Sequence, residues 1–464
     1  MNTRTFLPLP ALALALLQGC PNPKPPSEQP PPTEEPPPVE FAHGKQGQGA
    51  AFADLDGDGR DDKVVGAPWA QQGDKLGVLL VYPGTEQGFA ESAALKLTGE
   101  DNHGFAVLRL SDVDGDGHDE LAVSALTGNS TETALCGSVT VYRGGKNGEV
   151  LTTVAAGRPA AKFGYVMARG DLNADGQADL IVGAPFDTPD SALFQQGSVH
   201  VFLAPSFTTR ISLAATSANK GLGWAVASGD FDGDGKDDLL LGAAGKILGY
   251  RGGTGFAPAL DTPDLTVKSV AAGFGRSLAV AGEYIVVGAP AAKVGDARDT
   301  GALFVITRGT TPRTVDLDAT PTPADLLVTI PGPALFGRLG VALVPAGDVD
   351  ADGKADFVVG APGADVETND MRGRVYLFRG KDLGASTTLA SATGFPGTRR
   401  FQGYGSFLAV GKNNTLLIGA PRGDGDVGSA YVVDLASGQP VPGGATGGVS
   451  GGGEHCHDGQ CHGE

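Results

Sequence analysis

One short acidic segment recurs five times in this chain of 464 residues, and it constrains the fold more than any other feature. In every copy, positions 1, 3, 5 and 9 hold Asp, Asn or Glu, and position 6 holds Gly. The copies read DLDGDGRDD (54–62), DVDGDGHDE (112–120), DLNADGQAD (171–179), DFDGDGKDD (230–238) and DVDADGKAD (348–356). Alternating oxygen donors around a tightly turning Gly suit a hard cation with roughly six to eight oxygen ligands. The sequence therefore predicts about five Ca²⁺ sites, one in each loop.

The predicted ligands are the side chains at positions 1, 3, 5 and 9 of each loop, with the backbone carbonyl at position 7. They are Asp54, Asp56, Asp58 and Asp62; Asp112, Asp114, Asp116 and Glu120; Asp171, Asn173, Asp175 and Asp179; Asp230, Asp232, Asp234 and Asp238; and Asp348, Asp350, Asp352 and Asp356. His118 stands at position 7 of the second loop, so we expect its ring to lie in solvent. Five Ca²⁺ ions would bring the formal net charge from −19 to −9. A chain this acidic is a poor match for nucleic acid.

The residues after each loop argue against an EF-hand and indicate β-strands. An EF-hand needs a bidentate Glu at position 12, between two helices, but here position 12 falls inside an apolar run. These runs (KVVGAP, LAVSAL, LIVGAP, LLLGAA and FVVGAP) are short, rich in branched aliphatic residues and mostly closed by Gly or Pro. Such runs are typical of strands. We therefore interpret each acidic loop as a hairpin connection between two strands.

The strands belong to a repeat of nearly 60 residues. The residues that open the GAP-like tripeptides stand at positions 66, 124, 183, 242, 288, 360 and 419, so seven repeats are present although only five keep the acidic loop. A third strand follows the tripeptide, as in GVLLVY or GSVTVY, and a weaker fourth segment such as ALKLT or RISLA precedes the next repeat. Four strands in each repeat of this length predict the blades of a β-propeller.

These repeats resemble the FG-GAP repeat of integrin α-subunit propellers. The pairs that match the FG position are Gly104-Phe105 in reversed order, Phe163-Gly164, Leu222-Gly223, Phe274-Gly275, Phe336-Gly337 and Tyr404-Gly405. Repeat one lacks the aromatic residue and repeat two lacks the GAP tripeptide. The resemblance implies an all-β fold, a seven-bladed β-propeller of four-stranded antiparallel blades with calcium-binding hairpin loops. Because the carboxylates of one loop repel one another, we expect the bound calcium to be structural and to stabilise each hairpin, with calcium sensing as the alternative.

The resemblance further implies where a ligand would bind. In integrin-like propellers the calcium hairpins lie on one face, and connections between the second and third strands line the opposite face. Trp69 and Phe186 open two such connections directly after the GAP tripeptide. Large apolar residues in loops often anchor an interface, but packing against the base of their own loop would account for them equally. Both interpretations stay open.

Residues 1–19 resemble a bacterial lipoprotein signal peptide. An apolar stretch from Phe6 to Leu17 follows Arg4, and Leu-Gln-Gly precedes Cys20. The stretch is too short to span a membrane. We expect cleavage before Cys20 and lipid attachment to its thiol, with a plain secretory signal as the alternative. The protein would then be an extracytoplasmic, membrane-anchored lipoprotein of the outer membrane or cell surface.

The segment after the predicted lipidation site is a linker at residues 20–38. It holds ten prolines, so we expect a disordered, extended stalk that carries the propeller, residues 39–436. Repeat seven has three clear strands, and residues 39–42 could supply its fourth strand and close the ring.

Residues 437–464 form a Gly-rich, flexible tail that ends in a Cys/His cluster. In an oxidising compartment Cys456 and Cys461 would form a disulfide. The alternative is zinc or another soft metal held by these thiols and the neighbouring histidines.

Outside the acidic loops we find no residues with the spacing of a catalytic site. The G-x-S-x-G match at 448–452 lies in the glycine tail and lacks the strand-to-helix context of a nucleophile elbow. We therefore predict a monomeric, non-enzymatic binding or adhesion protein that recognises a protein or glycan partner at the cell envelope. A surface lectin is one alternative, although an aromatic content of 6% gives it little material. The other alternative is a propeller associated with a phospholipase or a polysaccharide lyase, because FG-GAP-like propellers also accompany such enzymes.

Overall fold

The structure is a computed structural model that describes residues 49–445 and two three-residue strands at 455–457 and 460–462. Within 49–445 the description omits 73–74, 101, 128–135, 146, 156–157, 190–194, 216–220, 294, 296, 334, 365–370 and 423–427. The chain divides into two units, Met1–Glu40 and Phe41–Glu464. The predicted signal peptide, Cys20, the stalk and the closing strand at 39–42 lie outside the described residues. Among the residues that are described, no helix has the length and apolar character needed to cross a membrane.

The regular secondary structure of the second unit's described residues is almost entirely β-strand, as the repeats predict. The strands are β1 (Ala50–Ala53), β2 (Asp62–Gln72), β3 (Lys75–Tyr82), β4 (Gly84–Thr85), β5 (Gly88–Phe89), β6 (Leu95–Leu97), β7 (His103–Ser111), β8 (Glu120–Ala125), β9 (Ser138–Tyr142), β10 (Val150–Val154), β11 (Val166–Gly170), β12 (Asp179–Ala184), β13 (Ser198–Phe202), β14 (Arg210–Ala214), β15 (Val226–Gly229), β16 (Asp238–Ala243), β17 (Lys246–Tyr250), β18 (Leu265–Lys268), β19 (Ser277–Ala281), β20 (Tyr284–Ala289), β21 (Ala302–Thr307), β22 (Arg313–Asp316), β23 (Leu326–Pro331), β24 (Leu343–Gly347), β25 (Asp356–Ala361), β26 (Arg374–Phe378), β27 (Thr393–Pro396), β28 (Phe407–Val410), β29 (Thr415–Ala420), β30 (Ser429–Asp434), β31 (His455–His457) and β32 (Gln460–His462). Two 3₁₀ turns, η1 (Gly380–Asp382) and η2 (Leu389–Ser391), lie between β26 and β27.

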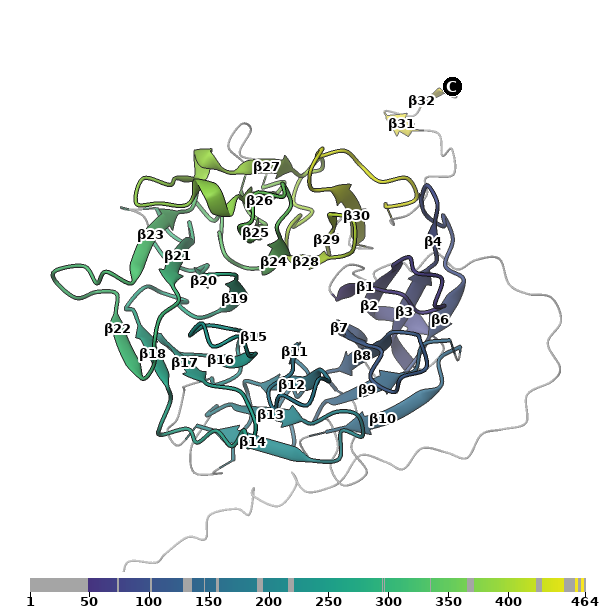
Figure 1. The fold of residues 1–464 in the computed structure, drawn as a ribbon. Helices are drawn as coiled ribbons and strands as arrows, with labels where there is room; N and C mark the ends of the chain where they lie inside the picture. The colour runs from purple at the N-terminus through teal and green to yellow at the C-terminus, as the bar shows by residue number, and fades with distance from the viewer. Residues whose placement is uncertain are drawn as a thin grey trace, which may run out of the picture. The chain divides into compact units, whose positions relative to one another are not determined.

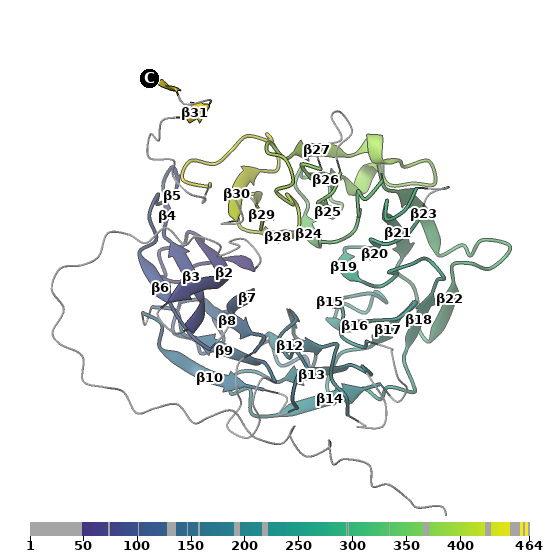
Figure 2. The same ribbon diagram turned by 180° about the vertical axis from the view of Figure 1, so that it is seen from behind.

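The fold is an all-β propeller built from four-stranded antiparallel blades, whose sheets follow one another around a central axis (Figures 1 and 2). Among the described residues, five sheets are separate blades: β11-β12-β13-β14, β15-β16-β17-β18 with β22 added, β19-β20-β21-β23, β24-β25-β26-β27 and the three-stranded β28-β29-β30. The prediction of seven separate blades is therefore wrong. The strands of the first two repeats share one eight-stranded sheet, in which β1-β2-β3 continues into β7-β8-β9-β10.

A single parallel residue pair, Gly77 with His103, joins the two halves of the eight-stranded sheet. The same kind of bridge stays isolated at other repeat junctions, where the pairs are Gly197 with Leu222, Gly301 with Leu339 and Gly373 with Tyr404. The first junction differs because β7 starts early, at His103, and runs for nine residues. Its extension turns an isolated bridge into part of a continuous sheet.

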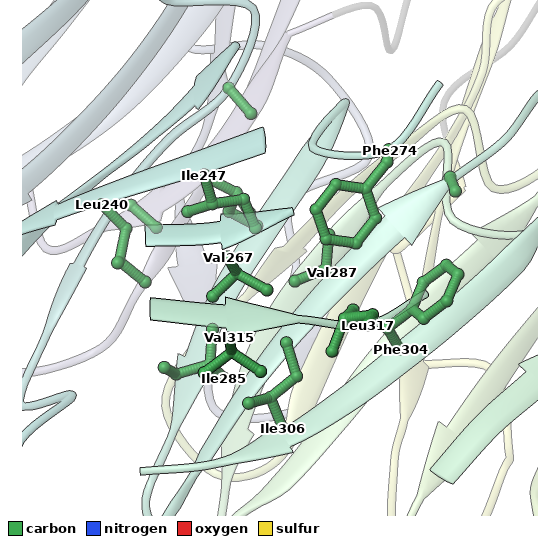
Figure 3. Packing of buried hydrophobic residues seen from close by; sticks show 14 of the residues in the cluster. Leu240, Ile247, Val267, Phe274, Ile285, Val287, Phe304, Ile306, Val315 and Leu317 are labelled. Atoms are coloured by element: carbon green, nitrogen blue, oxygen red, sulfur yellow. The ribbon is translucent and has the colours of Figure 1, made fainter. Parts of the chain in front are cut away.

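The second strand of each blade is almost entirely buried, since both of its faces pack against neighbouring sheets. This burial explains why runs such as DLLLGA in β16 and YIVVGA in β20 are continuously apolar after their first residue. Figure 3 shows one inter-sheet cluster, in which Leu240, Ile247 and Val267 pack towards Ile285 and Val287 of the next sheet. Burial between sheets is thus the main source of apolar stabilisation.

The glycine of the GAP tripeptide allows neighbouring blades to approach closely. A Cβ on Gly183 would collide with the carbonyl oxygen of Gly223, the glycine of the next FG-like pair. The same clash would occur between Gly360 and Gly405. The glycine of the GAP tripeptide and the glycine of the next FG-like pair therefore form one backbone contact between neighbouring blades.

The last sheet packs directly against the first. Phe52 of β1 and Val65 of β2 share an apolar cluster with Leu417 of β29 and Ala430 of β30. The outer edge of β30 is bonded by the chain that follows it, where the Val441 N–H donates to the Val432 carbonyl at 3.0 Å. Residues after β30 therefore cover the edge for which the sequence suggested 39–42.

These residues continue onto the first sheet, and we call residues 439–444 the C-terminal clasp. The Phe89 N–H donates to the Pro442 carbonyl at 3.0 Å. Lys63 is 0% exposed; its Nζ donates to the Gly443 carbonyl at 2.5 Å and lies 4.3 Å above the Tyr82 ring. Burial lowers the pKa of Lys63 to about 8. The clasp therefore accepts a hydrogen bond from a deeply buried ammonium group.

His200 of β13 lies in a buried polar network and is 4% exposed. Its Nε2 is 3.0 Å from Ser198 Oγ, and its Nδ1 is 2.8 Å from Ser212 Oγ. Burial lowers the pKa of His200 to about 4; nearby Arg210 lowers it further, and Asp187 opposes the shift. The imidazole is therefore neutral in the folded protein near pH 7.

We expect His200 to make the propeller sensitive to acid. Because its folded pKa lies below its unfolded pKa of about 6.5, its contribution to stability is complete above pH 6.5 and falls as the pH drops towards 4, by up to about 3 kcal/mol. Denaturant unfolding of the wild type and His200→Gln between pH 7 and pH 4 measures this. The stability difference between the two proteins should shift in favour of the variant in acid; a difference independent of pH would contradict the assignment.

Candidate cation loops and binding face

The acidic loops connect the first and second strands of their blades, as predicted. In every loop the position 9 carboxylate is the first residue of the second strand and is buried. One oxygen of this carboxylate accepts the backbone N–H of loop position 2. These bonds join Asp62 to Leu55 (3.0 Å), Glu120 to Val113 (2.7 Å), Asp179 to Leu172 (3.1 Å), Asp238 to Phe231 (3.0 Å) and Asp356 to Val349 (3.0 Å). A buried carboxylate thus closes the base of each loop.

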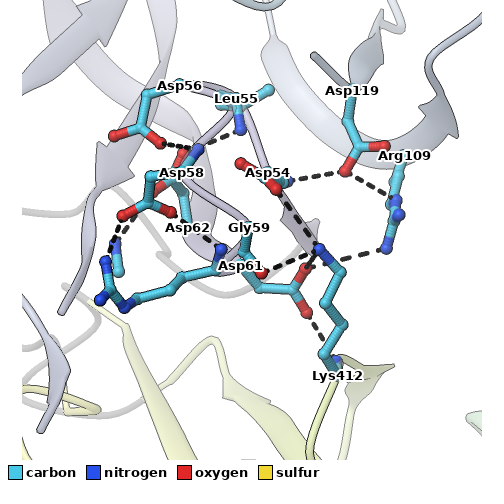
Figure 4. Close-up of polar contacts among 12 residues, drawn as sticks. Asp54, Leu55, Asp56, Asp58, Gly59, Asp61, Asp62, Arg109, Asp119 and Lys412 are labelled. Atoms are coloured by element: carbon cyan, nitrogen blue, oxygen red, sulfur yellow. Dashed lines mark hydrogen bonds and ion pairs between the residues drawn. The ribbon is translucent and has the colours of Figure 1, made fainter. Parts of the chain in front are cut away.

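The position 1 carboxylate organises the tip of four loops. In the second loop, Asp112 accepts N–H bonds from Gly115 at 2.7 Å and from Gly117 at 2.9 Å. Asp171, Asp230 and Asp348 accept the bond equivalent to that of Gly117 from the position 6 glycine of their own loops. The first loop differs in the partner of its position 1 carboxylate: Asp54 Oδ2 lies 3.4 Å from Lys412 Nζ of repeat seven (Figure 4).

Loop oxygens come close enough together to share one ion. Oxygens from three carboxylates lie within 4.8 Å of one another in each of four loops: Asp54, Asp56 and Asp58; Asp112, Asp114 and Glu120; Asp230, Asp232 and Asp234; and Asp348, Asp350 and Asp356. The structure therefore groups twelve of the twenty predicted ligands. The third loop forms no such group of carboxylates, since Asn173 replaces one of them and donates to Asp175 at 2.9 Å.

Burial disfavours the charged form of the position 9 carboxylates in loops one to four. The pKa of Asp62 and Asp179 is raised to about 6 and that of Glu120 and Asp238 to about 7, mainly by burial; backbone hydrogen bonds oppose the shift and neighbouring loop carboxylates add to it. Among the described residues, Asp54 Oδ1 and Glu120 Oε1 are buried without a hydrogen-bond partner. A divalent cation would offset the repulsion and use these free oxygens, so the residues fit calcium.

Side-chain cations already border several loops. Arg308 lies 3.2 Å from Asp230, Arg379 lies 3.1 Å from Asp356, and Arg143 pairs with Asp114. A divalent ion would therefore bind beside these cations and compete with them for the same carboxylates.

The expectation for His118 is wrong, since its ring is half-buried against the first loop. A Cβ on Gly57 would lie 2.8 Å from His118 Cε1, and a Cβ on Gly145 would lie equally close to His118 Nε2. The ring therefore packs between two glycines, a contact between repeats that loop position alone did not reveal.

Trp69 and Phe186 lie at strand ends remote from the acidic loops and belong to a row of aromatic side chains. The centroid distances are 6.0 Å for Trp69–Phe105, 5.6 Å for Phe105–Tyr165, 6.1 Å for Tyr165–Phe186, 5.2 Å for Tyr165–Trp224 and 5.0 Å for Phe186–Trp224. The Arg276 guanidinium lies 3.7 Å from the centroid of Trp224. We call these five aromatic residues and Arg276 the aromatic row; the rings are half-buried and Arg276 is exposed.

Sequence reasoning selected only two members of the aromatic row. The others, Phe105, Tyr165, Trp224 and Arg276, directly follow the glycine of the FG-like pair in four consecutive repeats. This shared position could have predicted the row. It lies near the start of the first strand of each repeat, and the acidic loop follows at the opposite end of the same strand. Trp69 and Phe186 each contact a ring of the next repeat, so neither packs only against its own loop.

The FG-like pair of repeat six is also corrected. The structure places Leu339-Gly340 there, since the Gly340 N–H donates to the Gly360 carbonyl at 3.0 Å just as Gly223 donates to Gly242 at 3.1 Å. Phe336 and Gly337 lie in the preceding turn, where Phe336 has a φ of 57°. The Phe-Gly dipeptide matched the motif by composition but not by position.

Family models match the same repeats. The FG-GAP repeat model matches residues 163–202, 222–257 and 340–378, and the FG-GAP-like repeat model matches residues 112–182. The chain therefore contains FG-GAP repeats within its β-propeller. The third match of the FG-GAP repeat begins at Gly340, in agreement with the corrected position.

The relatives of this chain include an enzyme and integrins. The chain is 26% identical to human phosphatidylinositol-glycan-specific phospholipase D over 414 residues, which cover 77% of this chain and 48% of the relative. It is 29% identical to integrin alpha pat-2 of Caenorhabditis briggsae over 229 residues, 44% of this chain and 18% of the relative. It is 33% identical to mouse integrin alpha-7 over 141 residues, 29% of this chain and 12% of the relative. The propeller thus spans less than half the length of these relatives.

Proposed function

We propose that the FG-GAP propeller is a calcium-stabilised, membrane-anchored binding or adhesion protein that recognises a protein or glycan partner at the cell envelope. The observation that carries this proposal is the aromatic row. Its six residues come from five consecutive repeats and touch one another in sequence. Half-buried aromatic rings that are held rigidly by their neighbours supply a large contact area at a low cost in side-chain entropy.

In this proposal the acidic loops do not contact the partner but stabilise the strands that carry the aromatic row. They lie at the opposite ends of the first strands, where about five Ca²⁺ ions would fix the hairpins that hold those strands in place. The first two repeats share the eight-stranded sheet, whose two halves meet at one residue pair, Gly77 and His103.

The ends of the chain complete the proposed arrangement. Lipid on Cys20 and the stalk at 20–38 would hold the propeller at the outer membrane or the cell surface. The tail at 437–464 ends in Cys456 and Cys461, which face each other in the register of β31 and β32. This register favours a disulfide over a soft-metal site; the two side chains lie outside the described part of the tail.

We propose that this chain is not itself an enzyme. FG-GAP repeats are non-catalytic modules, and Ser198 and His200, which are in hydrogen-bond contact, are both buried. The identity with a phospholipase D favours one second candidate, a propeller that accompanies a phospholipase activity. A surface lectin is the remaining alternative, and a glycan array would separate it from a receptor for protein.

We expect Trp224→Ala to weaken partner binding by about tenfold or more, because the substitution removes the centre of the aromatic row and the platform of Arg276. Binding to isolated envelope fractions and to a glycan array, with Ca²⁺ present, measures the effect. Phe401→Ala is the matched control, since Phe401 is 55% exposed in repeat seven and lies outside the row. Equal binding by the wild type and Trp224→Ala, at unchanged melting temperature, would refute the assignment of this face.

A further inference from the structure

Acidic loops of neighbouring repeats touch through loop position 8, the residue just before the buried position 9 carboxylate. Asp119 of the second loop accepts the Asp54 N–H on its Oδ2 at 2.7 Å, as Figure 4 shows. In return the Asp119 N–H donates to the Asp54 carbonyl at 2.9 Å. Asp119 is 6% exposed, and Arg109 Nε lies 2.9 Å from the same carboxylate oxygen. The first ligand of loop one is therefore held by a residue of loop two.

The contact recurs at two further junctions. Asp237 of the fourth loop accepts the Asp171 N–H at 3.0 Å. Asp61 of the first loop accepts the N–H of Lys412 at 2.6 Å. Lys412 belongs to repeat seven, which has no acidic loop. Loops three and five carry Ala178 and Ala355 at position 8, and an alanine side chain has no acceptor for such a bond.

Two more contacts connect loop one with loop two. The His118 ring packs against Gly57, as described above. The Gly145 N–H, from the connection after the third strand of repeat two, donates to the Leu55 carbonyl at 2.6 Å. Loop one is thus bonded at positions 1 and 2 and packed at position 4 by residues of repeat two.

We propose that Asp119 and Asp237 are positioning residues that couple cation binding in neighbouring loops, so that loops one and two, and loops three and four, bind Ca²⁺ cooperatively. This inference rests on the proposed calcium sites. Asp119 lies between the carbonyl of position 7 and the side chain of position 9, both predicted ligands of loop two. An ion that orders loop two therefore also orders Asp119, which fixes the first ligand of loop one before its own ion arrives. By thermodynamic reciprocity, an ion in loop one favours binding in loop two equally.

By the same argument, loops two and three should bind Ca²⁺ independently of each other. Position 8 of loop three is Ala178, so the Asp112 N–H of loop two has no carboxylate of this kind to bond. Coupling should therefore follow the identity of position 8 and not merely the adjacency of two loops.

The test uses the full chain with only loops one and two left intact, by Asp175→Ala, Asp234→Ala and Asp352→Ala. Isothermal titration with Ca²⁺ should show positive cooperativity, with the second ion binding at least about fivefold more tightly than the first. Asp119→Ala in this background should leave two independent sites. Asp119→Asn keeps an acceptor oxygen for the Asp54 N–H and should retain cooperativity. Asp237→Ala is the matched control and should change nothing.

A second experiment, which adds a carboxylate where the chain has none, tests the proposal even if Asp119→Ala does not fold. In a chain where only loops two and three are intact, the wild-type Ala178 should give two independent sites, and Ala178→Asp should introduce cooperativity. Independent binding in the first background, or cooperativity that survives Asp119→Ala, overturns the coupling but leaves the calcium sites standing. Failure of either background to bind Ca²⁺ overturns both the coupling and the proposed calcium sites.

Discussion

Removing calcium with excess EDTA should lower the melting temperature of the propeller by on the order of ten degrees. An ion that binds only the folded chain at a concentration 100 times its dissociation constant stabilises it by about 2.7 kcal/mol. The five proposed ions would act together. Each kcal/mol of stabilisation raises the melting temperature by roughly 2–4 °C in domains of 150–250 residues and by less in larger ones. Differential scanning calorimetry in Ca²⁺ and in EDTA gives the shift directly.

A variant with alanine at position 5 of all five loops is the control for this result. It should melt at the low temperature in both conditions, because it lacks a central ligand in every loop. Mg²⁺ in place of Ca²⁺ should recover only part of the shift, since Mg²⁺ demands a smaller octahedral site. Melting curves for the wild type that coincide in Ca²⁺ and EDTA would count decisively against filled loops.

Ending the chain after Ser437 should destabilise the propeller by several kcal/mol, whereas ending it after residue 445 should leave its stability unchanged. The shorter chain loses the C-terminal clasp. The Val432 carbonyl and the Phe89 N–H then lose their partners. Lys63 keeps its buried position but loses the Gly443 acceptor, and a buried ammonium without an acceptor is among the costliest groups in a protein.

Lys63→Met separates the charge from the rest of this effect. In the chain ending after Ser437 it should restore part of the stability, because methionine fills the site without a charge. In the full chain the same substitution should be neutral or destabilising. Urea unfolding of the four proteins forms a double-mutant cycle. Equal effects of Lys63→Met in the long and short chains would show that the Gly443 carbonyl does not serve Lys63.

Local features were predictable from the sequence because their causes lie within one repeat. The acidic loops connect strands, as the strand runs after them implied, and position 9 of each loop begins a buried strand. The runs in β16 and β20 are continuously apolar because they pack on both faces. A pattern of loop, strand and glycine thus identifies both the repeat and the secondary structure.

Contacts between repeats were less predictable, because residues tens of positions apart meet only through the ring geometry. Phe105 touches Tyr165 and Trp69, but no short motif contains any two of them. The Gly77–His103 pair merges two blades through one early strand start. The Phe336-Gly337 dipeptide drew the FG assignment away from Leu339-Gly340 because composition carries no information about the hydrogen bond to Gly360.

The meeting of the last sheet and the first has a mechanical consequence. Every other neighbouring pair of sheets is joined by a loop that runs from one sheet to the next, whereas among the described residues this seam is held by apolar packing, Lys63, Lys412 and the clasp. Heat, denaturant or a pulling force would therefore part the toroid at this seam first. The order in which such a molecule comes apart is set by which pair of sheets has no connecting loop between them.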